Sequence, residues 1–160
     1  MELKEVPLKI PAGYQLIIGQ SHFIKTVEDI YETLTTSVPG LAFGVAFSES
    51  SGKALIRSDG SDEAATKLAI ELASKIASGH SFVVILKDAY PINVLNRVKM
   101  VEEVANIFCA TANAITVVVA ESAGGRAILG VVDGVSPRGV ESTHERSERH
   151  EFLRKIGYKR

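Results

Sequence analysis

The sequence is short of the residues from which several common kinds of site are built. It has one cysteine, Cys109, which excludes an intrachain disulfide. Cys109 lies in an apolar run, which is typical of a small core residue rather than a nucleophile. One cysteine and four scattered histidines form no zinc-ligand pattern. The formal net charge of −1 gives no reason to expect a nucleic acid or an acidic membrane surface as partner.

Long hydrophobic runs are also absent. Charged residues, Glu2 and Lys4 among them, occupy the region where a signal peptide needs an apolar segment. The longest uncharged run, residues 104–120, is at the short limit for a bilayer span. It contains Asn106 and divides at residues 111–113, which predicts two buried strands joined by a turn. We therefore expect a soluble, cytoplasmic protein that does not enter a membrane.

Known nucleotide-binding signatures are missing too. The chain contains neither the G-x-x-x-x-G-K-[ST] sequence of a P-loop nor a Rossmann fingerprint. The segment 130–140 is rich in glycine and carries Ser136 and Arg138. Glycines allow the backbone to approach a ligand closely, and serine and arginine suit an anion. This segment is thus predicted to be a phosphate-binding loop.

The apolar pattern predicts a single compact domain over residues 1–160. Runs and periodicities give the element order β-β-α-β-β-α-β-α-β-β-β-α, an α/β (α+β-like) fold with a mixed, largely antiparallel sheet layered with helices. The unbroken apolar run 82–86 predicts a central strand. A charged C-terminal helix, about 142–157, begins at a capping box of Ser142 and Glu145 and is expected to dock through a small apolar stripe.

The segment 19–29 combines a strand end, a histidine and a helix start. A strand ends at Gly19, and His22 and Lys25 precede a helix predicted from Val27 to about Ser37. Thr26 is the expected N-cap, and Asp29 the carboxylate of a capping box. A helix start offers free N–H groups and partial positive charge, which suits an anion, although the carboxylates of the first turn oppose one. The alternative is that His22 is a polar loop residue and Thr26 only a cap.

Further polar residues stand at the ends of predicted elements, where functional sites collect. Asn93 and Asn96 share one face of a helix that begins near Pro91 and are either contacts for a ligand's hydrogen-bonding edge or solvated. Asp59, Asp62 and Asp133 are carboxylates in or next to loops. No serine hydrolase triad is indicated.

Seven blocks of the sequence carry a resemblance to a known family. They are GQSHFIKTVEDIYE, SVPGLAFGVAF, GHSFVVILK, AYPINVLNRVK, IFCATANAITVVVAE, GRAILGVVDGVSPRGVE and FLRKIGYK. In order and spacing they resemble the archaeal and bacterial adenosine-specific kinase family over nearly the whole chain. The resemblance implies a homo-oligomer, a trimer or a dimer of trimers, that binds adenosine and adenine nucleotides. It also implies a histidine that carries a phosphoryl group.

Two histidines lie within these blocks, His22 and His80. A phosphorylated imidazole at position 22 gains charge-assisted hydrogen bonds from Lys25 and the helix start. His80 follows a helix end, where the dipole opposes a phosphoryl group. We therefore predict His22 as the phosphohistidine and keep His80 as the alternative, its other interpretation being a buried structural residue.

The resulting functional prediction is an adenosine-specific kinase, a phosphotransferase. His22 passes a phosphoryl group between an adenine nucleotide, with ATP or ADP as donor, and adenosine, and Lys25 and Arg138 neutralise charge. Asn93 and Asn96 would read the adenine edge, Phe23, Phe43 or Tyr90 would stack on it, and Ser136 would join the substrate site. Mg²⁺ would be held by a carboxylate, with Asp59, Asp62 and Asp133 as candidates. The alternative is a non-catalytic adenosine or AMP sensor with a regulatory phosphohistidine.

Overall fold

The computed structural model describes the whole chain, residues 1–160, and contains the elements in the predicted order. The strands are β1 (Glu2–Leu8), β2 (Tyr14–Ser21), β3 (Ala42–Ser48), β4 (Ile56–Gly60), β5 (Ser81–Lys87), β6 (Val104–Thr111), β7 (Ile115–Ser122) and β8 (Gly125–Asp133). The helices are α1 (Thr26–Ser37), α2 (Glu63–Ile76), α3 (Leu95–Lys99), α4 (Thr143–Lys155) and the short 3₁₀ helix η1 (Pro91–Asn93).

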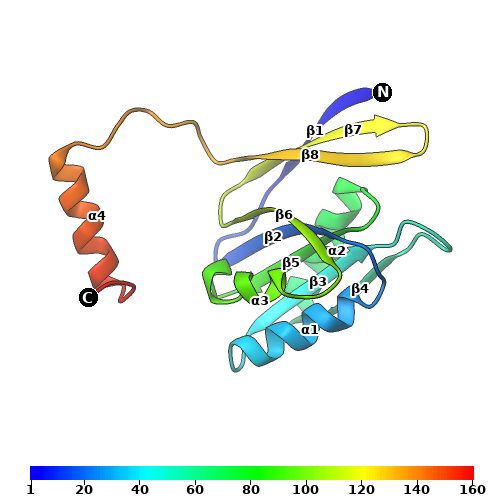
Figure 1. Ribbon diagram of the computed structural model, residues 1–160, viewed down its shortest axis with the longest axis horizontal. Coiled ribbons are helices and arrows are strands. Elements are labelled where there is room, and N and C mark those ends of the chain that lie inside the picture. Colours follow the sequence, from blue (N-terminus) through cyan, green and yellow to red (C-terminus); the bar gives the residue numbers. More distant parts are fainter.

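The strands form two antiparallel sheets (Figure 1). The larger has the order β4-β3-β5-β2-β6 and the smaller the order β1-β7-β8. The central place of β5 confirms the prediction made from its apolar run. Strand β1 lies at an edge, where Pro7 costs no ladder hydrogen bond inside a sheet. The α/β fold class is therefore confirmed, with antiparallel pairing throughout.

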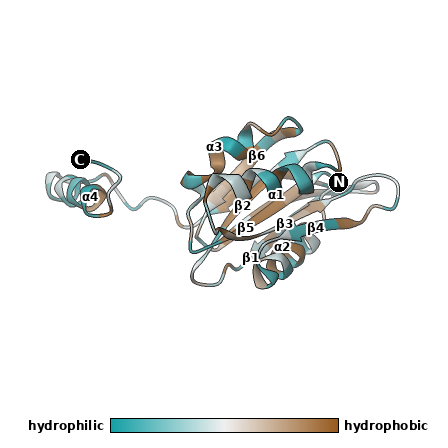
Figure 2. Cartoon of the chain, turned by 90° about the horizontal axis from the view of Figure 1, so that it is seen from below, coloured by the Kyte–Doolittle hydropathy of each residue, from teal (hydrophilic) through white to brown (hydrophobic).

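The five-stranded sheet is buried on both faces. On one face Ile17, Phe43 and Val84 pack with α1 and α3, and on the other Ile18 and Val83 pack with α2 and the smaller sheet. Figure 2 shows these apolar strands between the helices. Alternate residues of a strand point to opposite faces, so a strand covered on both sides must be apolar throughout. This layering leaves the ends of the sheet as the places where polar side chains collect.

Helix α2 lies unusually close to the sheet. A side chain on Gly44 would place its Cβ 2.3 Å from the backbone nitrogen of Thr66, so only glycine fits in β3 at this contact. Asp62 caps the helix by accepting from the Ala65 N–H. The helix ends at Ile76 and its left-handed cap is Ala77, with φ 51°.

Residues 134–160, here named the C-terminal arm, leave the body of the molecule after β8 (Figure 1). The capping box of Ser142 and Glu145 at the start of α4 is confirmed. The expected docking of α4 on its own body is wrong, because no residue of α4 is buried and Phe152 is 57% exposed. Three apolar residues in a strongly charged helix give too little area to hold it there. No helix in the structure has the length and apolar character needed to cross a membrane.

Candidate active site

Both candidate histidines lie at one end of the five-stranded sheet, where β2 ends and β5 begins; we call this the His22 end. Gly19 in β2 pairs with Phe82 in β5, and β2 has irregular register with β6 on both sides of Gly19–Gln20. A Cβ on Gly19 would lie 2.3 Å from the Phe82 ring. The glycine therefore leaves room for the Phe82 side chain to cross β2. Bulges of this kind change the direction of a strand near its end.

Backbone hydrogen bonds bring three distant segments together here. The Ser21 N–H donates to the His80 carbonyl at 3.0 Å, and the His22 N–H donates to the Glu103 carbonyl at 3.2 Å. The His22 loop is thus held between the start of β5 and the turn before β6. The helix-start pattern pointed only to His22 and Lys25, which are neighbours in the sequence. The backbone hydrogen bonds bring His80 and Glu103 next to them.

The two histidines have different surroundings. His22 is exposed, and its ring has no hydrogen-bond partner. His80 is half-buried with φ 60°, its N–H donates to Ser48 at 2.7 Å, and its ring stacks on Phe47 with centroids 5.9 Å apart. A left-handed backbone at a non-glycine residue persists only where its neighbours fix it. The ring of His22 is free to meet a ligand, and His80 joins β2 to β3.

Lys25 lies at the start of α1 as a member of an ion-pair cluster. Its Nζ pairs with Asp29 and lies 3.1 Å from Glu103 Oε2 and 3.9 Å from Glu102 Oε2. Hydrogen bonds to Asp29 and then to Glu103 raise the pKa of Lys25 well above its ordinary range. Lys25 is therefore a permanent cation at neutral pH and not a proton acceptor.

The expected capping at this helix start is wrong. Lys25, not Thr26, is the N-cap, and no side chain caps the helix. The Thr26 hydroxyl donates to the Phe23 carbonyl and lies 2.8 Å from the Ser21 hydroxyl, which closes the tight loop instead. Asp29 turns to Lys25 rather than back to a capping box. A cation one residue before the helix outcompetes the cap for this carboxylate.

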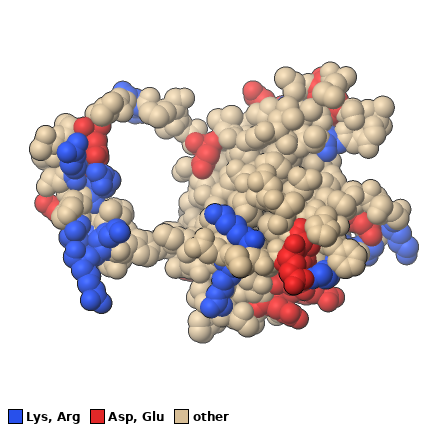
Figure 3. All heavy atoms as spheres, viewed as in Figure 1, with Lys and Arg blue, Asp and Glu red and all other residues tan.

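Glu103 is the buried acid of the site. It is 1% exposed, one carboxylate oxygen faces Lys25, and the other, Oε1, has no partner. With Asp29 and Glu102, three carboxylates surround one lysine, and Figure 3 shows red side chains gathered beside blue over this part of the body. The local charge is therefore negative, which weakens the prediction of a ready anion site. A buried carboxylate with a free oxygen is instead suited to accept a proton or a hydroxyl hydrogen bond.

A cavity of about 440 Å³ opens beside His80. It lies among the end of β3, the 49–55 loop, the end of α2 and the β7–β8 turn; Leu55 and Ile56 supply apolar walls, and Ser48, Ser50 and Gly79 line it too. The Ser48 hydroxyl is buried and has no hydrogen-bond partner. An apolar hollow with a few unpaired polar groups is typical of a small-molecule site.

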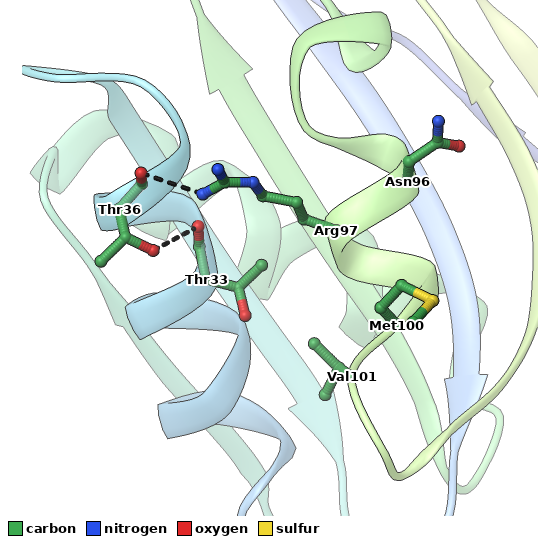
Figure 4. A pocket seen from close by; sticks show the side chains of 6 residues that line it. All are labelled: Thr33, Thr36, Asn96, Arg97, Met100 and Val101. Carbon is green, nitrogen blue, oxygen red and sulfur yellow. Dashed lines mark hydrogen bonds between the residues drawn. The ribbon is translucent and has the colours of Figure 1, made fainter.

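A second, more open depression runs between α1 and α3, and we call it the α1–α3 groove. One part, of about 400 Å³, is lined by Thr33, Thr36, Asn96, Arg97, Met100 and Val101 (Figure 4). The adjoining part shares four of these residues and adds Asp29, Glu32 and Glu102. The Arg97 guanidinium donates to the Thr36 carbonyl at 3.1 Å and ties the two helices together. Of the predicted adenine-reading pair, only Asn96 lies in this groove.

Other predicted substrate residues lie away from His22. Asn93 belongs to η1, its side chain accepts from the Tyr90 N–H, and the chain breaks from helical geometry at Val94, so Asn93 and Asn96 share no helix face. Ser136 and Arg138 belong to the C-terminal arm, which leaves the body on the side opposite the loop joining β2 to α1 (Figure 1). Only Phe23, 52% exposed, lies beside His22.

The carboxylates named as candidates for Mg²⁺ are hydrogen-bonded to separate partners. Asp133 accepts hydrogen bonds from Thr111 and Asn113, while Asp59 accepts from the neighbouring Gly60 N–H. Asp62 caps α2, and the chain has no group of three or more acidic, histidine or cysteine side chains able to hold a metal ion. Burial raises the pKa of the Cys109 thiol to about 11, so this residue is a protonated core thiol as predicted.

Comparisons with known proteins agree with this fold. The model of the family described as adenosine specific kinase matches residues 6–159, and the chain belongs to that family. Among solved structures, it is similar to the crystal structure of the PH1918 protein from Pyrococcus horikoshii OT3. The two are 43% identical, with a TM-score of 0.95, over 99% of this chain and 98% of that chain. A search of curated proteins gave no match.

Proposed function

We propose that this chain is an adenosine-specific kinase in which His22 carries the phosphoryl group. The observation that supports this most directly is that His22 has an exposed ring and donates its backbone N–H to the carbonyl of Glu103, a buried acid with one unpartnered carboxylate oxygen. A nucleophile accompanied by a proton acceptor is what two-step phosphoryl transfer requires. Membership of the family supports adenosine as the acceptor.

In the first step a neutral His22 ring nitrogen attacks the terminal phosphorus of ATP. The nitrogen–phosphorus bond forms, the bond to the bridging oxygen breaks, and ADP leaves. In the second step the ribose 5′-hydroxyl of adenosine attacks the same phosphorus, the bond to His22 breaks, and the hydroxyl proton passes to the Glu103 carboxylate. AMP leaves, and Glu103 returns the proton to water. Lys25, a permanent cation, offsets the charge on the phosphoryl oxygens.

The cavity beside His80 is the proposed adenosine site. Adenosine is uncharged, so it tolerates acidic surroundings that repel a free phosphate. Leu55 and Ile56 offer apolar contact for the base, and the free Ser48 hydroxyl offers a hydrogen bond to its edge or to the ribose. Phe23 remains a proposed stacking residue beside His22. Mg²⁺ that accompanies the ATP phosphates would be held by a carboxylate, for which Asp59 and Asp133, each hydrogen-bonded to its own neighbour, are candidates.

A non-catalytic adenosine or AMP sensor is the second candidate. It is favoured by the three carboxylates around Lys25, which disfavour a bound nucleotide phosphate. In this function any phosphohistidine is regulatory and does not pass its phosphoryl group to adenosine. The two functions differ only in the second transfer step, which can be measured directly.

The test uses ATP labelled in its terminal phosphate. We expect label on the wild-type protein, stable to alkali and labile to acid, and its transfer to adenosine on a chase. His22→Ala should abolish the label, while His80→Ala, checked for folding by its melting temperature, should retain it. Label that survives in His22→Ala would remove His22 from the role. Label that stays on the protein during the adenosine chase would support the sensor instead.

A further inference from the structure

Glu49 is the one acidic side chain among the residues that line the cavity beside His80. It follows directly after β3, and its side chain is only 16% exposed. The Arg57 guanidinium of β4 pairs with it at 3.0 Å. A carboxylate is costly to remove from water unless it is paired and hydrogen-bonded, so the contacts that Glu49 makes decide what it can do in the cavity wall.

Both the backbone and the side chain of Glu49 are fixed by neighbours. The Glu49 N–H donates to the Leu55 carbonyl at 3.0 Å. Its side-chain Oε2 accepts from the Leu55 N–H at 3.1 Å and from the Arg57 guanidinium at 3.0 Å. The same loop packs tightly on Gly79, where a Cβ would lie 2.7 Å from the Ser50 Cβ. The carboxylate is therefore held in one place before a ligand arrives, which lowers the cost of binding to it.

One oxygen of this carboxylate is left for a ligand. The Leu55 N–H, and then Arg57, hold the pKa of Glu49 below its ordinary value, so at neutral pH the group is ionised and only accepts hydrogen bonds. Each carboxylate oxygen has two lone pairs, and the two donors already described use both lone pairs of Oε2. Oε1 has no hydrogen-bond partner and, unlike the Ser48 hydroxyl, is not sealed from solvent. The cavity wall therefore offers one fixed acceptor with room for two donors.

We propose that Oε1 of Glu49 accepts hydrogen bonds from the 2′- and 3′-hydroxyls of the ribose, and that Glu49 thereby selects ribonucleosides over deoxyribonucleosides. This inference rests on the proposed function, in which the cavity beside His80 takes adenosine. The ribose diol is the part of adenosine that presents two donors side by side. The adenine edge places its amino donor next to a ring-nitrogen acceptor, which a carboxylate repels. A phosphate presents acceptors and negative charge, so it fits this wall less well still.

This contact also fits the direction of the proposed reaction and sets the size of the discrimination. The 5′-hydroxyl lies at the other end of the ribose from the diol, so holding the diol on Glu49 leaves the reacting hydroxyl free. An analogue without the diol leaves the carboxylate facing the cavity without its donors, and a site built to bind a hydroxyl rejects such an analogue. Because Oε1 keeps some contact with solvent, water offsets part of this loss. We therefore expect discrimination of about 30-fold rather than the thousands of fold found in fully closed sites.

The test compares adenosine with 2′,3′-dideoxyadenosine by calorimetric titration of the full-length protein. In wild type the Kd for the dideoxy analogue should be about 30-fold higher than that for adenosine, with 2′-deoxy- and 3′-deoxyadenosine in between. In Glu49→Gln the ratio should fall to about threefold, because a neutral amide is a weaker acceptor. Glu71→Gln makes the same chemical change at a glutamate that pairs with Lys75 on α2 and does not line the cavity, so it is the matched control and should keep the wild-type ratio.

Two results would overturn the proposal. Equal affinity of the wild-type protein for adenosine and its dideoxy analogue would do so without any variant, so the test does not depend on how Glu49→Gln folds. A Glu49→Gln protein with the wild-type melting temperature and the full 30-fold ratio would limit Glu49 to holding the 49–55 loop. Neither result touches the labelling of His22 by ATP or the transfer of that label to adenosine. Failure of this inference is therefore distinguishable from failure of the proposed function, which would show as a wild-type protein that takes no label or does not bind adenosine.

Discussion

The two ends of the five-stranded sheet use their polar residues differently. At the end where β2 begins and β5 finishes, the polar groups are paired: Asn93 accepts from Tyr90, Asp133 from Thr111, and Asp62 faces Lys87 at 3.4 Å. At the His22 end, the oxygens Glu103 Oε1 and Ser48 Oγ are buried without partners. Buried polar groups are normally hydrogen-bonded, so unpaired ones call for an explanation. Unpaired oxygens are typical of groups that bind a ligand. The hydrogen-bonded polar groups at the opposite end of the sheet have a structural role.

The largest expected effect comes from the unpaired carboxylate. Glu103→Gln keeps the side-chain shape but removes the proton acceptor, so kcat for AMP formation should fall about 100-fold or more. Asp133→Asn at the paired end is the matched control and should leave kcat within about twofold, because its partners there are structural. Steady-state assays at saturating adenosine measure both. Equal losses in the two variants would mean that the ends do not differ in function.

The next-largest effect is expected from a substitution at Gly19, where the Phe82 side chain crosses β2. In Gly19→Ala the new Cβ would lie 2.3 Å from the Phe82 ring and 2.7 Å from the Asn106 carbonyl, so the free energy of unfolding should fall by about 2 kcal/mol. Phosphorylation of His22 should fall too, because the loop that holds it follows directly. Gly130→Ala in β8, where a Cβ meets nothing within 4 Å, is the control. Chemical denaturation measures the difference, and equal stability of the two variants would contradict this account of the bulge.

A smaller pair of effects compares one hydroxyl at each end. Ser48→Ala removes a buried hydroxyl with no partner, so stability should be unchanged while the Kd for adenosine rises about fivefold. Thr111→Val removes a hydroxyl that donates to Asp133 and accepts from the Asn113 N–H, so stability should fall by about 1 kcal/mol with the Kd unchanged. Calorimetric titration and thermal unfolding measure the two quantities. If Ser48→Ala lost stability and kept its affinity, the cavity beside His80 would not be the adenosine site.

The sequence predicted the elements well because their signals are local. The apolar runs of β3 and β5 and the periodicity of α1 and α2 each need only a short window, so the whole element order is confirmed. The pairing of Lys25 with Glu103, 78 residues apart, has no local signal, and Glu103 was missed for that reason. The only local sign of it is the pair of glutamates at 102–103 before an apolar strand.

Other errors have equally specific causes. The sequence did not indicate Ser48 either, because burial at a sheet end depends on what packs over it, here α2 and the β7–β8 turn. The capping box at Asp29 failed because Lys25 competes for the same carboxylate. Ser136 and Arg138 were grouped with His22 by residue type alone, whereas the structure places both in the C-terminal arm. Residue type does not show which parts of the chain lie together.

The smallest effect tests the paired end through pH. The Ala65 N–H and then Lys87 lower the pKa of Asp62 below its ordinary value, so its folded pKa lies below its unfolded one. Stability from this carboxylate is therefore fully present above the unfolded pKa and is lost as pH falls through the folded pKa. Asn also caps helices well, so Asp62→Asn removes mainly the charge and should lower the melting temperature near neutral pH by roughly 2 °C.

That difference should shrink toward zero as the pH is lowered from about 7 to about 3, because the wild-type carboxylate then takes up its proton. Asp59→Asn is the matched control, since the Asp59 carboxylate accepts only from the adjacent Gly60 N–H and faces no cation. Thermal unfolding of the three proteins across this range measures the effect. A difference in melting temperature between wild type and Asp62→Asn that persists unchanged in acid would contradict this. It would show that the charge of Asp62, and with it the ion pair to Lys87, does not stabilise this end of the sheet.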